Sequence, residues 1–383
     1  GDLIVTSSLT LVPSSLSTGF TATDPRMEVR TVVDGGVRAT FPRPAGTYYR
    51  VGTRFSADGK RILVEGRANV ANARRDVTVY DVDTLAPIGP TVTLEGTLRQ
   101  AWLTPDGFRI LTTSGDHTVE VYDARTGKSA VPPLKHGGPA ALAGLSDDGN
   151  MLATTCVDGL CRLWDLRTGT LVAEATYKQE RASPVALSPD GRTLLVTERS
   201  GLVHQLRATS GPATALDLVG LPPVLGPEGT SIAPLLPTLV QFAPGSPARV
   251  LWFEVSAANL IDLPSGRVIS GGFKFPFNVS PTSSFPLAGG RNRGTEGEPV
   301  MTFIARHRDV PSQIWNYDAA GAVQTANFTD QLTNNAVFVL SPNRRYTAAM
   351  LTPVAEARWL GIWDLRTGLR VARFVLRPLC SRA

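Results

Sequence analysis

Two short motifs recur along the chain at a fixed spacing, and this repeat limits the possible folds more than any other feature of the sequence. The first motif joins an apolar run to a turn built from Ser or Thr, Pro or Asp, and Gly. Its clearest copies are residues 102–107, 144–149, 186–191 and 54–59. Pro presets φ within such a turn and Gly accepts a positive φ, so each copy predicts a turn between two strands.

The second motif places an aromatic residue and Asp at the end of an alternating strand, followed by a turn through Thr-Gly. Its copies are residues 122–127, 164–169, 363–368 and, with Leu in place of Gly, 80–85. The Ser/Thr position precedes the Asp position by 19 residues in four consecutive copies, and 23 residues separate the Asp position from the next first motif in four cases. A 42-residue unit with four short strands is the period of a β-propeller blade.

This repeat resembles the WD-repeat family, in degenerate copies of bacterial type. The resemblance implies an all-β fold, a single WD-repeat-like β-propeller domain over residues 1–383 that is part of a longer protein. We expect eight four-stranded blades, because counting back 42 residues from Ser56 reaches Ser14 after an apolar run. The alternative is seven blades, with residues 1–46 as an N-terminal strap. The predicted blades are roughly 1–46, 47–94, 95–136, 137–178, 179–220, 235–270, 271–330 and 331–378.

The same resemblance implies a buried hydrogen-bonded network in the fourth blade. In this family a His before the first strand, a Ser/Thr on the second strand, an Asp in the following turn and a Trp ending the third strand contact one another. The matching residues here are His136, Thr154, Asp158 and Trp164. A Trp N–H, a hydroxyl and an imidazole can satisfy one another when buried, and we expect Asp158 to hold the imidazole in place. We interpret this set as structural and not as a catalytic triad.

Departures from the 42-residue spacing predict insertions, which are places where function can be added. Extra residues at 67–75, 289–297 and 352–358 are expected in turns between second and third strands, and more lie in the Pro-rich connection around 221–227. Such turns and the blade-to-blade connections share one face of a propeller. We therefore expect a partner-binding patch of arginines, which suits carboxylates or phosphates: Arg67, Arg74, Arg75, Arg291, Arg293 and Arg358. The competing interpretation is a set of solvated loops.

No pattern of catalytic or metal-binding residues accompanies the repeat. The four His residues lack metal-ligand spacing, and neither a Cys-x-x-Cys, a Gly-x-Ser-x-Gly nor a phosphate-binding loop occurs. We therefore predict no catalytic residue, metal or cofactor. A net charge of +5 on 383 residues is too dilute to indicate nucleic acid.

Cys156 and Cys161 flank Asp158-Gly159, a pair typical of two-residue hairpin turns. Such a turn would place the two thiols opposite each other, close enough for a disulfide. We prefer reduced packing residues, with the disulfide as the alternative. Three Cys in this length, no secretory signal and no apolar run of membrane-spanning length together favour the cytoplasm.

The predicted function is protein–protein interaction: a scaffold, sensor or recruitment domain that binds a protein or peptide partner, possibly an acidic one, on the loop-rich face. Two alternatives remain open. One is a propeller enzyme, a hydrolase or lyase with its site at the central channel. It is disfavoured by apolar inner strands such as 141–145. The other is an envelope or periplasmic propeller.

Overall fold

The computed structural model describes the backbone of most of the repeat. The described residues are 3–13, 20–31, 36–40, 48–68, 75–94, 100–176, 185–197, 203–208, 216–220, 239–242, 246–253, 257–265, 267–274, 285–286, 299–305, 313–318, 323–327, 338–340, 345–351, 358–365 and 367–376.

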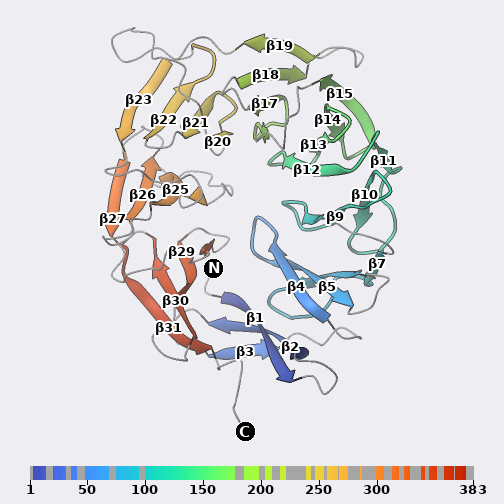
Figure 1. Ribbon diagram of the computed structural model, residues 1–383, viewed down its shortest axis with the longest axis vertical. Helices are drawn as coiled ribbons and strands as arrows, with labels where there is room; N and C mark the ends of the chain where they lie inside the picture. The colour runs from blue at the N-terminus through green and yellow to red at the C-terminus, as the bar shows by residue number, and fades with distance from the viewer. Residues whose placement is uncertain are drawn as a thin grey trace.

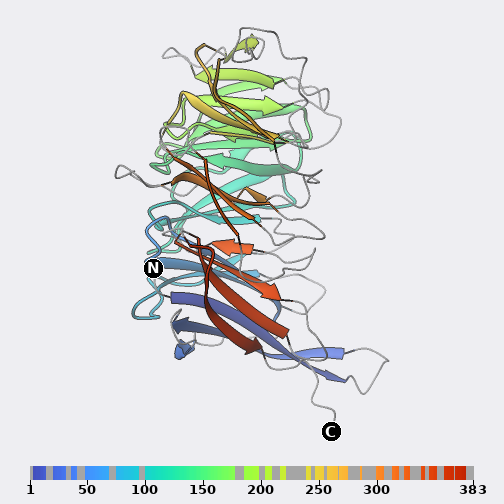
Figure 2. The same cartoon turned by 90° about the vertical axis from the view of Figure 1, so that its left-hand side faces the viewer.

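The described strands form eight antiparallel sheets, each built from consecutive strands. The sheets stand around a ring in chain order, and the last sheet, β28–β31, lies beside the first, β1–β3 (Figure 1). Seen edge-on, the ring is a disc that is thinner than it is wide (Figure 2). Each sheet has its earliest strand toward the centre of the ring and its latest strand toward the rim (Figure 1). The predicted all-β propeller architecture is confirmed. No helix in the described part of the chain has the length and apolar character that crossing a membrane requires.

The strands of the first four sheets run from the N-terminus to residue 176. They are β1 Leu3–Pro13, β2 Phe20–Thr31 and β3 Val37–Thr40; β4 Tyr48–Phe55, β5 Arg61–Ala68, β6 Arg75–Asp81 and β7 Val92–Leu94; β8 Gln100–Leu103, β9 Arg109–Thr113, β10 Thr118–Asp123 and β11 Leu134–Lys135; and β12 Ala140–Leu145, β13 Met151–Cys156, β14 Leu160–Asp165 and β15 Thr170–Thr176.

The other four sheets follow in the same strand order. They are β16 Val185–Leu187, β17 Thr193–Thr197, β18 Val203–Ala208 and β19 Leu216–Gly220; β20 Leu239–Phe242, β21 Arg249–Phe253, β22 Ala257–Asp262 and β23 Arg267–Lys274; β24 Phe285–Pro286, β25 Pro299–Ala305, β26 Gln313–Asp318 and β27 Val323–Asn327; and β28 Phe338–Leu340, β29 Tyr346–Leu351, β30 Arg358–Asp364 and β31 Arg370–Leu376.

The core lies between neighbouring sheets and not in one central mass. Leu63, Val77 and Val79 of one sheet pack against Ala101, Leu103 and Ile110 of the next. Further seams join Leu111, Val119 and Val121 to Leu142, Leu152 and Trp164, and Ala153 and Cys161 to Leu194 and Val196. Neighbouring sheets cover both faces of a sheet in the ring, so its strands are apolar on both faces. This explains why polar and apolar residues alternate only weakly along these strands.

Strand register explains the fixed spacing of the two motifs. The first residue of each second strand pairs with the motif Asp position that ends the third strand: Arg109 with Asp123, Met151 with Asp165 and Thr193 with Arg207. Both motifs therefore lie at the same end of every sheet. We call the end that carries residues 56–59, 104–107, 146–149 and 188–191 the motif end, and the other end the connection end.

The first sheet differs from the expected blade. Its second strand, β2, continues from Phe20 to Thr31 and pairs with β1 along its length, and the next described strand is β3 at Val37–Thr40. Three strands are described in this sheet. The choice between eight blades and seven blades with a strap therefore stays a prediction.

The insertions do not all lie at the connection end. Residues 69–74 and 352–357 join second to third strands, and 221–238 joins two sheets, as expected. The segment 289–297 instead lies between β24 and β25, a first and a second strand, so its predicted placement is wrong. Pro299, the first residue of β25, pairs with Asp318, which puts the extra length before the second strand. The spacing between the two motifs gives only the total number of residues between them. It does not show which turn contains the extra residues.

Candidate functional site

The first motif forms the same buried turn in four sheets. Its hydroxyl donates to the motif Asp at 2.5 Å from Ser56 to Asp58 and from Ser146 to Asp148, and at 2.6 Å in the other two copies. The same hydroxyl accepts the amide that opens the second strand, as in Met151 N to Ser146 Oγ at 2.9 Å. All four hydroxyl residues are at most 2% exposed. Gly149 has φ of +72°, which this turn requires. The motif carboxylates therefore build turns.

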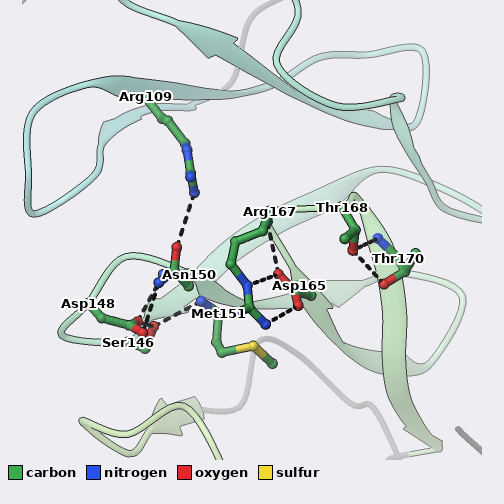
Figure 3. A network of polar contacts seen from close by, with 9 residues as sticks. All are labelled: Arg109, Ser146, Asp148, Asn150, Met151, Asp165, Arg167, Thr168 and Thr170. Carbon is green, nitrogen blue, oxygen red and sulfur yellow. Dashed lines mark hydrogen bonds and ion pairs between the residues drawn. The ribbon is translucent and has the colours of Figure 1, made fainter. Parts of the chain in front are cut away.

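The second motif also uses its Asp as a turn acceptor. Asp165 Oδ1 accepts from the Arg167 amide at 2.8 Å, and Asp165 Oδ2 lies 2.6 Å from the Arg167 guanidinium (Figure 3). The Arg167 side chain holds the pKa of Asp165 below its ordinary value. Adjacent sheets are linked here as well, because Arg109 Nη1 donates to Asn150 Oδ1 at 3.4 Å (Figure 3).

At the connection end of the seam between sheets β8–β11 and β12–β15, the structure brings together His136, Thr154 and Trp164. Trp164 Nε1 donates to Thr154 Oγ1 at 2.9 Å, and His136 Nε2 lies 2.9 Å from the same oxygen. His136 Nδ1 lies 3.0 Å from the Leu134 carbonyl oxygen, which can only accept. The ring is therefore protonated on Nδ1 when neutral, and Thr154 donates its hydroxyl to Nε2. Every polar atom of the trio then has one complementary partner.

Asp158 does not hold the imidazole as the sequence suggested. Its Oδ2 accepts from the Gly137 amide at 3.1 Å and lies 2.8 Å from Arg162 Nη2. Burial opposes ionisation of Asp158, but the Arg162 side chain and the Leu160 and Gly137 amides outweigh it, so the pKa of Asp158 is well below its ordinary value. The Leu134 carbonyl takes the orienting role, because the carboxylate is already used by the chain segment that precedes β12.

The His136 environment predicts a pH-dependent stability. Burial lowers the pKa of His136 below 6.5, so the unfolded chain binds a proton in a pH range where the folded chain does not. Stability is then full above that value and falls as the pH decreases through it. We expect the melting temperature of the wild-type protein to drop more than that of His136→Gln between about pH 7.5 and about pH 5.5. Equal drops in the two proteins would contradict this.

The two buried cysteines do not face each other. Thr155, not Cys156, pairs with Cys161, because the turn between β13 and β14 has three residues, 157–159, instead of the expected two. Gly159 closes it with φ of +80°. The one-residue shift sends the thiols to opposite faces, where Cys156 packs toward one neighbouring sheet and Cys161 toward the other. Neither forms a disulfide, and burial raises the pKa of Cys161 to about 12. The reduced state that we preferred from the sequence agrees with these positions. The predicted placement of the two thiols opposite each other was wrong. Cys380 lies outside the described residues.

The predicted arginine patch divides into separate parts. Arg75 forms an ion pair with Glu65 on the neighbouring strand of the same sheet and is only 17% exposed, so its charge is already used within the fold. Arg67 lies in β5 and Arg358 begins β30. Arg74 lies outside the described residues and directly precedes β6. Arg291 and Arg293 also lie outside them, in the sequence between β24 and β25.

Sequence reasoning missed a set of residues at the motif end. Arg54, Trp102, Phe108 and Arg125 form cation–π contacts around one seam. The sequence contains a signal that could have identified this set. Among the aligned copies of the first motif in residues 54–192, aromatic residues occupy the positions of Trp102 and Phe108 in one copy.

Comparison with known proteins identifies the repeat. Residues 134–165 match the family model "WD domain, G-beta repeat". The structure is similar to the β-propeller domain of Cps50 (Swd1) from Myceliophteria thermophila, at 18% identity and a TM-score of 0.51, over 73% of this chain and 86% of that one. It is also similar to the WD40 domain of SCAP from fission yeast, at 13% identity and a TM-score of 0.56, over 87% and 89%. No curated protein matches the sequence significantly. Residues 134–165, which contain the His136–Thr154–Trp164 trio, therefore match a WD repeat, and the ring of antiparallel sheets has the β-propeller fold of these WD-repeat structures.

Proposed function

We propose that this propeller is a non-enzymatic protein-interaction domain that recruits a partner at its connection end. WD40 propellers commonly act as protein-interaction scaffolds. The motif carboxylates accept hydrogen bonds within turns, and the polar side-chain atoms of His136, Thr154 and Trp164 are already hydrogen-bonded. Both observations support a binding role over a catalytic one.

The observation that carries the proposal is the connectivity of two sheets. Residues 69–74 and 352–357 both join a second strand to a third, so both emerge at the connection end. Their sheets, β4–β7 and β28–β31, stand on either side of sheet β1–β3 in the ring (Figure 1). In the sequence, Arg67, Arg74 and Arg358 stand beside these two insertions, whose sheets belong to one sector of the ring. Guanidinium groups suit carboxylates on a protein surface.

The proposal predicts that charge reversal in this sector removes partner binding without unfolding the ring. We expect Arg67→Glu/Arg74→Glu/Arg358→Glu to lose more than about tenfold of the partner recovered by affinity capture of the full-length protein, because rim charges set electrostatic complementarity. The matched control is Arg167→Glu/Arg192→Glu, which places acidic residues at the motif end. Quantitative mass spectrometry measures recovery, and the melting temperature checks folding. Unchanged recovery from a folded triple variant would exclude this sector.

We also propose the cytoplasm as the compartment. Two buried cysteines that do not form a disulfide, Cys156 and Cys161, support a reducing environment. Fractionation of cells that express the full-length protein tests this.

A further inference from the structure

The motif end carries aromatic residues, Trp102 and Phe108, that the turns of the repeat do not require. Two residues before the first-motif hydroxyl, the four best copies have Arg54, Trp102, Gly144 and Ala186. Four residues after it, they have Lys60, Phe108, Asn150 and Arg192. All four turns form with the same hydrogen bonds. Aromatic side chains at both positions occur in one copy, that of sheet β8–β11, so turn formation does not explain them.

Both aromatic rings hold arginine side chains. The Arg54 guanidinium carbon lies 5.4 Å from the centre of the Trp102 ring. Phe108 lies between Arg61 at 3.9 Å and Arg125 at 4.1 Å. Arg54 and Arg61 come from sheet β4–β7, whereas Arg125 follows β10 of the same sheet as Phe108. These contacts fix the guanidinium planes at one seam between two sheets.

The three arginines differ in their remaining partners. Arg61 is used by the fold, since its Nη1 donates to the Asp106 carbonyl at 3.0 Å and lies 3.7 Å from Asp58. Arg54 and Arg125 are exposed, and in the part of the chain that the structure describes neither side chain forms an ion pair.

Arg125 and Arg167 make the contrast clear. Each is two residues after the Asp of its second motif, and each donates its amide to that Asp at 2.8 Å. The Arg167 side chain returns to its own Asp165 at 2.6 Å. The Arg125 side chain instead lies on Phe108. Its charge therefore stays available at the surface, with the guanidinium already oriented.

We propose that Arg54 and Arg125, held against Trp102 and Phe108, form a docking site for an acidic protein segment, each arginine binding one carboxylate. A guanidinium that lies on an aromatic ring keeps its edge N–H groups free for a two-point contact with a carboxylate. Trp and Arg are also among the residue types enriched in binding hot spots. Asp58, Asp106 and Asp123 lie in the same turns and would repel the evenly spaced phosphates of a nucleic acid backbone, whereas the glutamate side chains of a peptide can turn away from these carboxylates, which favours an acidic peptide over nucleic acid. This site is at the opposite end of the ring from the recruitment sector proposed above.

The test measures binding of a fluorescein-labelled oligoglutamate peptide to the purified chain by fluorescence anisotropy. We expect saturable binding that weakens by at least about tenfold in Arg54→Ala/Arg125→Ala, because hydrogen bonds to charged groups are the strong ones. Arg54→Lys/Arg125→Lys should restore only part of the affinity, because lysine lacks the planar fork. The matched control, Arg167→Ala/Arg192→Ala, removes the same charge from the same end and should bind within about twofold of wild type.

Three results would overturn the proposal: no saturable binding, equal weakening in the control, or equally tight binding of a labelled oligothymidylate of the same charge. The Arg67→Glu/Arg74→Glu/Arg358→Glu variant should bind oligoglutamate like wild type. Its behaviour in partner capture is measured separately, so the two proposals can fail independently. Melting temperatures of all variants confirm that they are folded.

Discussion

Replacing Trp363 with alanine is expected to lower the free energy of unfolding by about 3 to 5 kcal/mol, the range for large aromatic residues in closely packed cores. Trp363 is 0% exposed and is the next-to-last residue of β30 in the last sheet. Its indole lies directly over Gly361, where an added Cβ would overlap the ring atoms. Alanine would lose the apolar surface buried between sheets, and the rigid strands around it cannot close the cavity.

Denaturant unfolding measures this change. Far-UV circular dichroism of the backbone is the signal, because the substitution removes a tryptophan and would alter the fluorescence. Val371→Ala is the control, because Val371 lies in β31 of the same sheet and is 39% exposed. Its expected cost is within about 0.5 kcal/mol. A cost below about 1 kcal/mol for Trp363→Ala would show that this residue is not packed between sheets.

Thr154→Val is expected to cost about 1 to 3 kcal/mol, although the two side chains have nearly the same shape. Thr154 is 0% exposed, and its hydroxyl is the shared partner of Trp164 Nε1 and His136 Nε2. Valine would leave a buried donor and a buried acceptor without partners, and each of these groups would carry its desolvation penalty. Denaturant unfolding again gives the magnitude.

A second substitution separates hydrogen bonding from packing. If the trio acts as one unit, Thr154→Val combined with His136→Gln should cost less than the sum of the two single changes. Thr155→Val is the control, because Thr155 is the next residue on β13, faces the other side and is partly exposed. Strict additivity, or an equal cost at Thr155, would mean that the Thr154 hydroxyl has no shared role.

Sheets β12–β15 and β28–β31 show how far a repeat predicts its own structure. Trp164 and Trp363 hold the same motif position, and Asp165 and Asp364 end the third strand in both. The spacing predicted this equivalence because strand pairing has a fixed rise per residue. It did not predict where each indole lies: Trp164 donates a hydrogen bond to Thr154, whereas Trp363 packs over Gly361, at the position where sheet β12–β15 has Arg162.

Turn length was the weakest part of the sequence prediction. Asp158-Gly159 indicated a two-residue turn, and the three-residue turn that forms moves Cys156 to the other face from Cys161. The insertion at 289–297 fits two different turns with the same total spacing. Both errors arise because sequence spacing fixes the sum of strand and turn lengths but not their division.

Side-chain pairing within and between sheets could also not be predicted from the repeat. Arg75 was predicted as a surface residue from its place beside an insertion, but it pairs with Glu65, which lies on β5 of the same sheet two residues before Arg67. Arg54 and Trp102 are 48 residues apart, and only the closing of neighbouring sheets brings them together. Such contacts depend on how adjacent blades pack, which the period alone does not specify.

A crystal structure of the chain is the most direct test of the central claim that each 42-residue unit is one antiparallel sheet of a ring. We expect consecutive four-stranded sheets standing radially, with Met151 paired to Asp165 and Tyr346 to Asp364, and the last sheet beside the first. Helical segments in the repeat, or two large sheets packed face to face, would contradict it.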